Sequence, residues 1–133
     1  MQGKSFMQRA VEILCLIQFT IVGLSHIVQR HAWVDFFLWL RERGYPGVFV
    51  HGFLSLSFGS FIVAFHPIWT GWPAVLTVVG CLYLFKATLC FLLPATQMKT
   101  LGRVAHERAW EFCVPGAIYL AVAGIVTWTL WAG

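Results

Sequence analysis

Charged side chains are scarce in this sequence. They make up 11% of the 133 residues, against about 25% in soluble globular domains. This scarcity excludes a disordered tail and an ordinary water-soluble enzyme. The nine Lys and Arg stand in ones and twos rather than in the clusters that contact phosphates, so no nucleic-acid partner is expected. The four cysteines contain no C-x-x-C pair, so neither a disulfide framework nor a zinc motif is indicated.

Hydrophobic residues are correspondingly abundant, at 59% of the chain. They form four apolar runs, and a helix needs about 20 such residues to cross a bilayer. The runs cover residues 10–28, 46–66, 68–94 and 112–133. We therefore predict an all-α, single-domain integral membrane four-helix bundle embedded in the lipid bilayer, with both chain ends on one side.

Two polar connectors separate these spans. The first, residues 29–44, has Trp33, Phe36, Phe37 and Leu40 at helical spacing, which favours a short interfacial helix between spans one and two. A loop with an aromatic anchor is the alternative. The second connector covers residues 95–111, and a tight uncharged turn is expected between spans two and three.

The distribution of basic residues predicts the orientation of the spans. Lys4 and Arg9 are the only two near the N-terminus, whereas six lie in the two connectors. The positive-inside rule then places both connectors in the cytoplasm and both termini outside. The six connector residues are Arg30, Arg41, Arg43, Lys99, Arg103 and Arg108.

Small residues indicate where helices pack closely, because close backbone approach drives helix association in lipid. Gly52, Ser55 and Gly59 share one face of the second span at helical spacing. A similar group on the fourth span comprises Gly116, Ala117, Ala121 and Gly124. Both faces are predicted to be packing surfaces.

Polar residues inside the spans are the candidate functional residues. An ionisable group in hydrocarbon costs about 2.5 kcal/mol or more, so each should face the interior. On the first span Glu12, Cys15, Phe19, Gly23 and His26 form one stripe. The alternating direction of the spans places one set of polar residues at the connector end, where we predict a ligand-binding pocket. Its predicted members are His26, His51, Tyr83, Lys86 and Glu111, and a second polar cluster, Glu12 and His66, is predicted at the opposite end.

The state of Lys86 has two interpretations. It pairs with Glu111 or a histidine inside the bundle, or it extends toward the lipid headgroups.

The pocket has three possible ligands. Histidine and lysine donors beside an apolar cavity suit a small molecule, a lipid headgroup or a quinone. His26 and His51 are alternatively axial ligands of a haem, or with Cys113 they bind copper or zinc. No nucleophile elbow, phosphate loop or pair of catalytic carboxylates is present, so catalysis by this chain is not expected. The Glu12 and His66 cluster leaves a small transporter or proton conductor as a further alternative.

The layout resembles the DoxX-like superfamily of small bacterial membrane proteins, and also resembles uncharacterised bacterial families of that shape. The similar features are residues 23–26 (Gly-Leu-Ser-His) closing span one, the aromatic connector, the span with Gly52, Ser55 and Gly59, and the short turn after it. Relatives often have a lysine near the end of span one, where this chain has His26. The resemblance implies a four-helix bundle in the bacterial inner (cytoplasmic) membrane, which is sometimes an accessory subunit of a quinone-linked oxidoreductase and is often of unknown function.

From these observations we expect a non-catalytic binding or accessory subunit of a larger membrane assembly. Its expected partners are other membrane subunits or further copies of the chain. The alternative is a redox subunit that holds haem or quinone.

Overall fold

The computed structural model describes residues 3–132, and this part of the chain is all-α. Four of its helices are long and apolar enough to cross a membrane, with the fourth span formed by η1 and α6 together. The layout is that of a multi-pass membrane protein. In chain order the elements are α1 (Phe6–Val28), α2 (Arg30–Glu42), α3 (Tyr45–Phe65), α4 (Ala74–Leu92), α5 (Pro94–Leu101), the 3-10 helix η1 (His106–Phe112) and α6 (Cys113–Ala132).

Capping and turn residues explain where two spans differ from the prediction. α1 begins at Phe6 rather than at residue 10, because Ser5 and Gln8 form a capping box. The Ser5 hydroxyl accepts from the Gln8 backbone N–H, and the Gln8 side-chain oxygen accepts from the Ser5 backbone N–H. α4 begins at Ala74 rather than at residue 68. Pro67 restricts the backbone before it, and Gly71 turns the chain at a φ of +72°. The predicted end of the fourth span at residue 133 lies outside the described residues.

The connectors are more helical than a loop interpretation allows. The predicted short helix between spans one and two is confirmed as α2. Its Trp33 Nε1–H donates to the Ser25 hydroxyl of α1 at 2.9 Å, which fixes the start of α2 against the end of α1. The second connector contains α5 and η1, which the sequence pattern did not predict. Pro94 begins α5 because its fixed φ suits the first helical turn.

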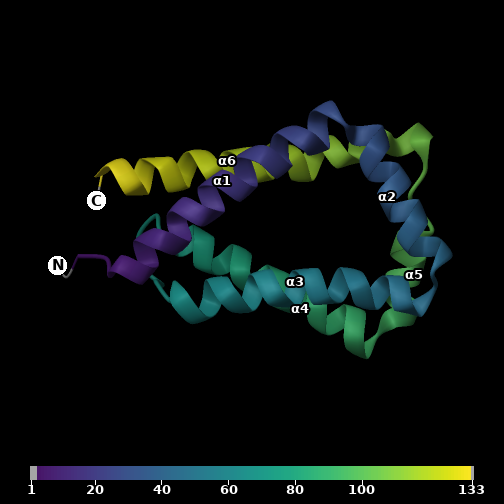
Figure 1. The fold of residues 1–133 in the computed structure, drawn as a ribbon, viewed down its shortest axis with the longest axis horizontal. Helices are drawn as coiled ribbons and strands as arrows, with labels where there is room; N and C mark the ends of the chain where they lie inside the picture. Colours follow the sequence, from purple (N-terminus) through teal and green to yellow (C-terminus); the bar gives the residue numbers. More distant parts are fainter. Residues whose placement is uncertain (1–2, 133) are drawn as a thin grey trace.

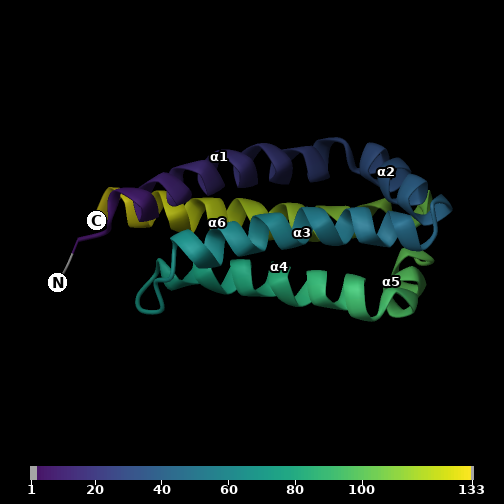
Figure 2. The ribbon, with the colours of Figure 1, turned by 60° about the horizontal axis from the view of Figure 1, so that its bottom comes forward.

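The four spans form two antiparallel pairs and not one evenly packed bundle. α1 packs on α6 and α3 packs on α4, with few contacts between the pairs (Figure 1). The start of α1 and the end of α6 lie at the same end of the molecule, which we call the terminal end (Figures 1 and 2). Toward the opposite end, the connector end, α1 diverges from α3 and α4, and α2, α5 and η1 bridge the two pairs. The molecule is therefore a wedge.

Glycines permit the close approach inside each pair. A Cβ on Gly59 would lie 2.8 Å from the Gly80 carbonyl oxygen, and one on Gly23 would lie 3.0 Å from the Gly116 carbonyl oxygen. The predicted packing face of α3 is therefore confirmed.

The prediction for the fourth span is wrong for three of its four residues. Gly124 has open space around it, and Ala117 and Ala121 are exposed. Of the four, only Gly116 packs closely. The buried face of α6 runs from Gly116 through Ala123 and Val126, and the other three residues lie off this face.

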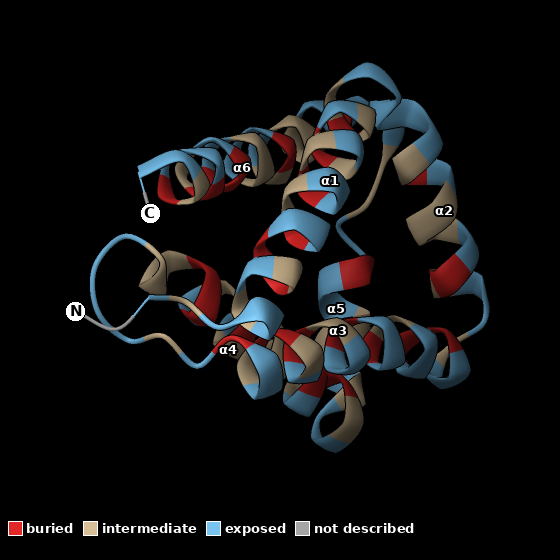
Figure 3. Cartoon of the chain, turned by 60° about the vertical axis from the view of Figure 1, so that its left-hand side comes forward, coloured by how far each residue is buried: buried red, intermediate tan, exposed pale blue. Residues whose placement is uncertain are grey.

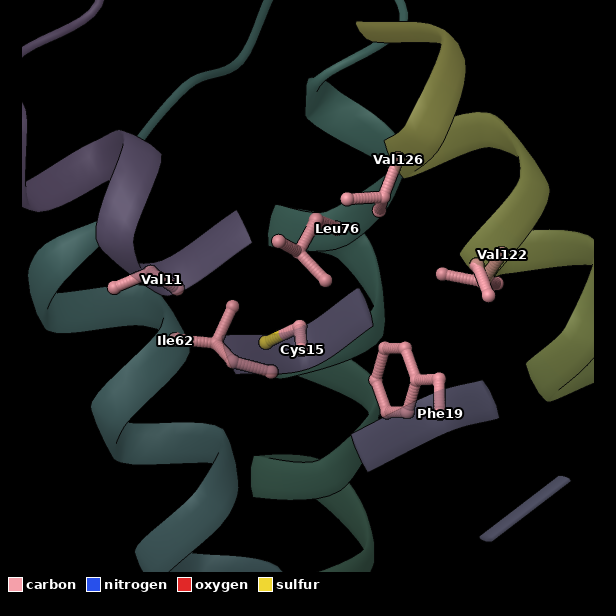
Figure 4. Close-up of a cluster of buried hydrophobic side chains, with 8 residues drawn as sticks. Val11, Cys15, Phe19, Ile62, Leu76, Val122 and Val126 are labelled. Carbon is pink, nitrogen blue, oxygen red and sulfur yellow. The ribbon is translucent and has the colours of Figure 1, made fainter. Parts of the chain in front are cut away.

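An apolar core joins the two pairs near the terminal end. Its side chains come from all four spans, and Figure 4 shows them converging. Exposed residues lie on the outward faces of the long helices and buried ones where helices meet (Figure 3). The predicted α1 stripe from Glu12 to His26 is confirmed as the buried face of that helix. The core residues are Val11, Cys15, Phe19, Ile62, Leu76, Val122, Ala123 and Val126.

Candidate functional site

Two adjoining cavities lie between the helix pairs at the connector end. The first, which we call the connector cavity, has a volume of about 240 Å³. The second, the aromatic cavity, has a volume of about 530 Å³. Because several residues line both, the two cavities are compartments of one site. The shared residues are Phe37, His51, Lys86, Phe112 and Pro115.

The connector cavity is rich in positive charge. Lys86 of α4 lines it together with Arg103 and Arg108, which belong to the second connector. Glu111 is the single carboxylate in this lining, and it accepts from the Arg103 guanidinium at 3.4 Å. Three cations therefore face one anion, and the field in the cavity favours a negatively charged group.

Lys86 is the central residue of the site. It lines both cavities, so its side chain is directed to the interior of the wedge and not outward to lipid. Its ammonium group makes no hydrogen bond or ion pair with any residue of the described chain. The predicted partner Glu111 pairs with Arg103 instead, so that part of the hypothesis is wrong. An unpaired cation is costly at membrane depth, which favours a ligand or water against Lys86.

The predicted residues His26 and Tyr83 belong to the aromatic cavity. His26 is buried, its Nδ1 lies 2.8 Å from the Val22 carbonyl oxygen, and its ring stacks on Trp33 with centroids 4.0 Å apart. The Tyr83 hydroxyl donates to the Tyr119 hydroxyl at 2.8 Å. The wall of this cavity is chiefly aromatic, and the polar atoms of its His26 Nδ1 and of its Tyr83 and Tyr119 hydroxyls are occupied by partners within the protein.

The two histidines are separated by a series of rings. His51 lies edge-on to Phe37 at 5.1 Å between centroids, Phe37 lies 5.4 Å from Phe112, and Phe112 lies 6.3 Å from His26. A haem with His26 and His51 as axial ligands would have to displace these rings. Within residues 3–132, no three His, Cys, Asp or Glu side chains are grouped to hold a metal, so His26, His51 and Cys113 are not assembled as a copper or zinc site.

The second predicted cluster, Glu12 and His66, is assembled at the terminal end. His66 Nε2 lies 2.8 Å from Glu12 Oε1, and the Lys4 ammonium donates to Glu12 Oε2 at 3.0 Å. His66 Nδ1 lies 3.2 Å from the Thr77 hydroxyl, which donates to the His66 carbonyl. Lys4 also donates to the Thr129 carbonyl at 3.1 Å. We call Lys4, Glu12, His66 and Thr77 the terminal clamp, because it joins the N-terminal segment, α1, the α3–α4 turn, α4 and α6.

The clamp and the cavities are separate sites. The apolar core of all four spans lies near the clamp, while the cavities open at the connector end. Glu12 and His66 are almost completely buried, with 1% and 0% exposure, and their polar atoms are satisfied by neighbouring residues. This arrangement is that of a structural bridge between the helix pairs.

Sequence reasoning missed several residues that the structure adds. Arg103 and Arg108 indicate orientation in the sequence, and in the structure they also line the connector cavity. Lys4 and Thr77 join the clamp, although no periodic pattern connects them to Glu12.

A third polar group lies outside both sites. The His106 ring bridges Asp35, at 2.8 Å, and His31, at 3.0 Å. The spacing of His31 and Asp35, four residues apart on α2, could have indicated that they share a helix face.

Comparison with known proteins adds no assignment. No protein-family model, curated protein or solved structure matches this chain.

Proposed function

We propose that the protein is a non-catalytic, membrane-embedded binding protein for a small molecule with an anionic or carbonyl oxygen. The ligand occupies the cavities at the connector end, with its oxygen against Lys86. The observation that carries this proposal is the position of Lys86 at the junction of the two cavities, without a partner among the described residues. An oxygen-bearing ligand would supply the missing partner of this cation.

The surroundings of Lys86 support the same function. His51 also lines both cavities and forms no hydrogen bond with another described residue, so it adds a second polar group for the ligand. Arg103 and Arg108 make the entrance at the connector end cationic. A mainly apolar cavity with a few convergent polar groups is the usual form of a small-molecule site.

The layout of the four spans supports a cellular role for this site. We propose an accessory subunit in the inner membrane of a bacterium, consistent with the resemblance to the DoxX-like superfamily. A quinone is one ligand of the proposed class, because its carbonyl oxygens accept hydrogen bonds from lysine and histidine.

Binding of defined probes to the purified protein tests the proposal. We suggest dodecanoate as the anionic probe, decylubiquinone as the carbonyl probe and dodecanol as the uncharged match, with the protein in lipid nanodiscs and affinity measured by calorimetry. Lys86→Met should weaken binding of dodecanoate or of decylubiquinone about tenfold or more, because a hydrogen bond to a charged group is lost.

The matched control is Lys99→Met, which removes an exposed lysine that lines neither cavity. It should leave both affinities unchanged. Equal affinity of wild type and Lys86→Met for both probes, or preferential binding of dodecanol, would overturn the proposed function.

A further inference from the structure

We propose that the ligand is a long-chain amphiphile with an acidic head, and that its chain leaves the protein sideways into the bilayer between α1 and α3. This inference rests on the proposed function and narrows it to one ligand class. The head lies in the connector cavity, and the chain runs through the aromatic cavity past Gln18 and Leu54.

Charged residues are distributed unevenly between the two cavities. The connector cavity contains Lys86, Arg103 and Arg108, whereas Lys86 is the single charged residue among those lining the aromatic cavity. In the aromatic cavity the Tyr83 hydroxyl is bound to Tyr119, and His26 Nδ1 faces a carbonyl. A ligand that fits both compartments is therefore charged at one end and apolar along the remainder.

The volumes of the two cavities also suit the two parts of such a ligand. Sites for small molecules usually measure about 300–1,000 Å³. The connector cavity, at about 240 Å³, falls below this range and suits a carboxylate or phosphate head without the rest of a ligand. The aromatic cavity, at about 530 Å³, continues from it and provides the space for a chain.

The aromatic cavity reaches the surface of the protein between α1 and α3. Gln18 of α1 and Leu54 of α3 both line the aromatic cavity, and both are exposed, Leu54 at 59%. The exposed faces of these two spans would contact lipid, so the cavity meets the hydrocarbon between them. α1 and α3 diverge from the terminal end toward the connector end, which leaves room for this opening (Figure 1).

Gln18 itself marks the opening. It lies in the middle of α1, where an amide without a hydrogen-bond partner is costly in hydrocarbon. No other residue of the described part of the chain forms a hydrogen bond with its side chain. At the edge of a cavity, however, the amide reaches water or a ligand as well as lipid.

A chain-length series tests the ligand class. The probes are butanoate, octanoate, dodecanoate and oleate, all with the same head, bound to the wild-type protein in nanodiscs. Affinity, expressed relative to the concentration of acid in the membrane, should rise about tenfold or more from butanoate to dodecanoate, because added methylenes enter the aromatic cavity. Dodecyl phosphate distinguishes a phosphate head from a carboxylate head, and tight binding of either supports an acidic amphiphile.

A blocking substitution tests the route of the chain. Leu54→Trp fills the opening and should weaken dodecanoate binding severalfold more than it weakens butanoate binding. The control is Leu56→Trp, on the same helix and also exposed, which lines neither cavity. Leu56→Trp should bind both acids as the wild type does.

The outcomes separate this inference from the proposed function. If butanoate binds as tightly as dodecanoate and Lys86→Met abolishes both, Lys86 is a ligand-binding residue and the long-chain inference is wrong. If Leu54→Trp and Leu56→Trp bind dodecanoate equally, the lateral route is wrong. Loss of the Lys86 dependence overturns both proposals.

Discussion

Two glutamates of this chain pair with cations, one in a buried environment and the other in an exposed one. Glu12 is buried between Lys4 and His66, whereas Glu111 pairs with Arg103 at a site where both side chains are exposed. A buried ion pair is costly to break by removing one partner, because the other partner is left uncompensated. An exposed pair contributes little, because water and salt screen it.

The same substitution at both positions should therefore have different effects. We expect Glu12→Gln to lower the free energy of unfolding by about 3 kcal/mol or more. Glu111→Gln should change it by less than about 1 kcal/mol. Reversible unfolding in mixed micelles measures both, and equal effects would show that the terminal clamp is not a stabilising bridge.

Residue positions were predictable where helical periodicity determined them. The stripe from Glu12 to His26 follows the helix repeat, and it is the buried face of α1. The meeting of Glu12 and His66 followed from the alternating direction of the spans. The pairing of Lys86 with Glu111 failed because Arg103, in an irregular connector, lies closer to Glu111. No periodic signal places such a connector residue.

At the scale of elements, glycine contacts hold each helix pair together. A Cβ on Gly59 would meet backbone atoms of α4, the Gly80 oxygen at 2.8 Å and the Leu84 nitrogen at 3.0 Å. Backbone atoms cannot rotate away as a side chain does, so α3 and α4 would have to separate.

We expect Gly59→Ala to lower the free energy of unfolding by about 1–3 kcal/mol, the usual cost of overpacking. Gly124→Ala on α6 is the control, since nothing lies within 4 Å of a Cβ there. It should be neutral or stabilising by up to about 1 kcal/mol, because alanine favours the helix. A destabilising effect of Gly124→Ala as large as that of Gly59→Ala would contradict this packing model.

The fold class was predictable from composition, but the wedge was not. Four apolar runs of sufficient length specify four spans, and these are present. At the connector end, where α1 lies apart from α3 and α4, the elements α2, α5 and η1 bridge the two pairs. The helical extent of the second connector had no clear sequence pattern, so the wedge could not be predicted, whereas the pocket residues at the connector end followed from the alternating direction of the spans.

For the whole molecule, the terminal clamp increases the difference in positive charge between the two ends, because it neutralises a cation at the terminal end. Lys4 is paired with Glu12, which leaves Arg9 as the unpaired cation among the described residues of the terminal end. Six Lys and Arg lie in the two connectors at the other end. We therefore expect the connectors in the cytoplasm and both termini outside.

Reporter fusions in a bacterial host measure this orientation. Alkaline phosphatase fused after residue 132 should be active, and green fluorescent protein fused there should be dark. The same reporters inserted at Ala105, in the second connector, should show the reverse. Fluorescence from the C-terminal fusion would mean that the opposite orientation is correct.

The pairing of α1 with α6 has a consequence for synthesis of the protein. α3 and α4 are adjacent in the chain, so this hairpin can form as soon as both helices have left the ribosome. The partner of α1 is α6, which is translated after both helices of this hairpin, so the Gly23 surface remains uncovered until Gly116 has been synthesised. Throughout that interval, lipid, the α3–α4 hairpin or the insertion machinery must cover the Gly23 face of α1.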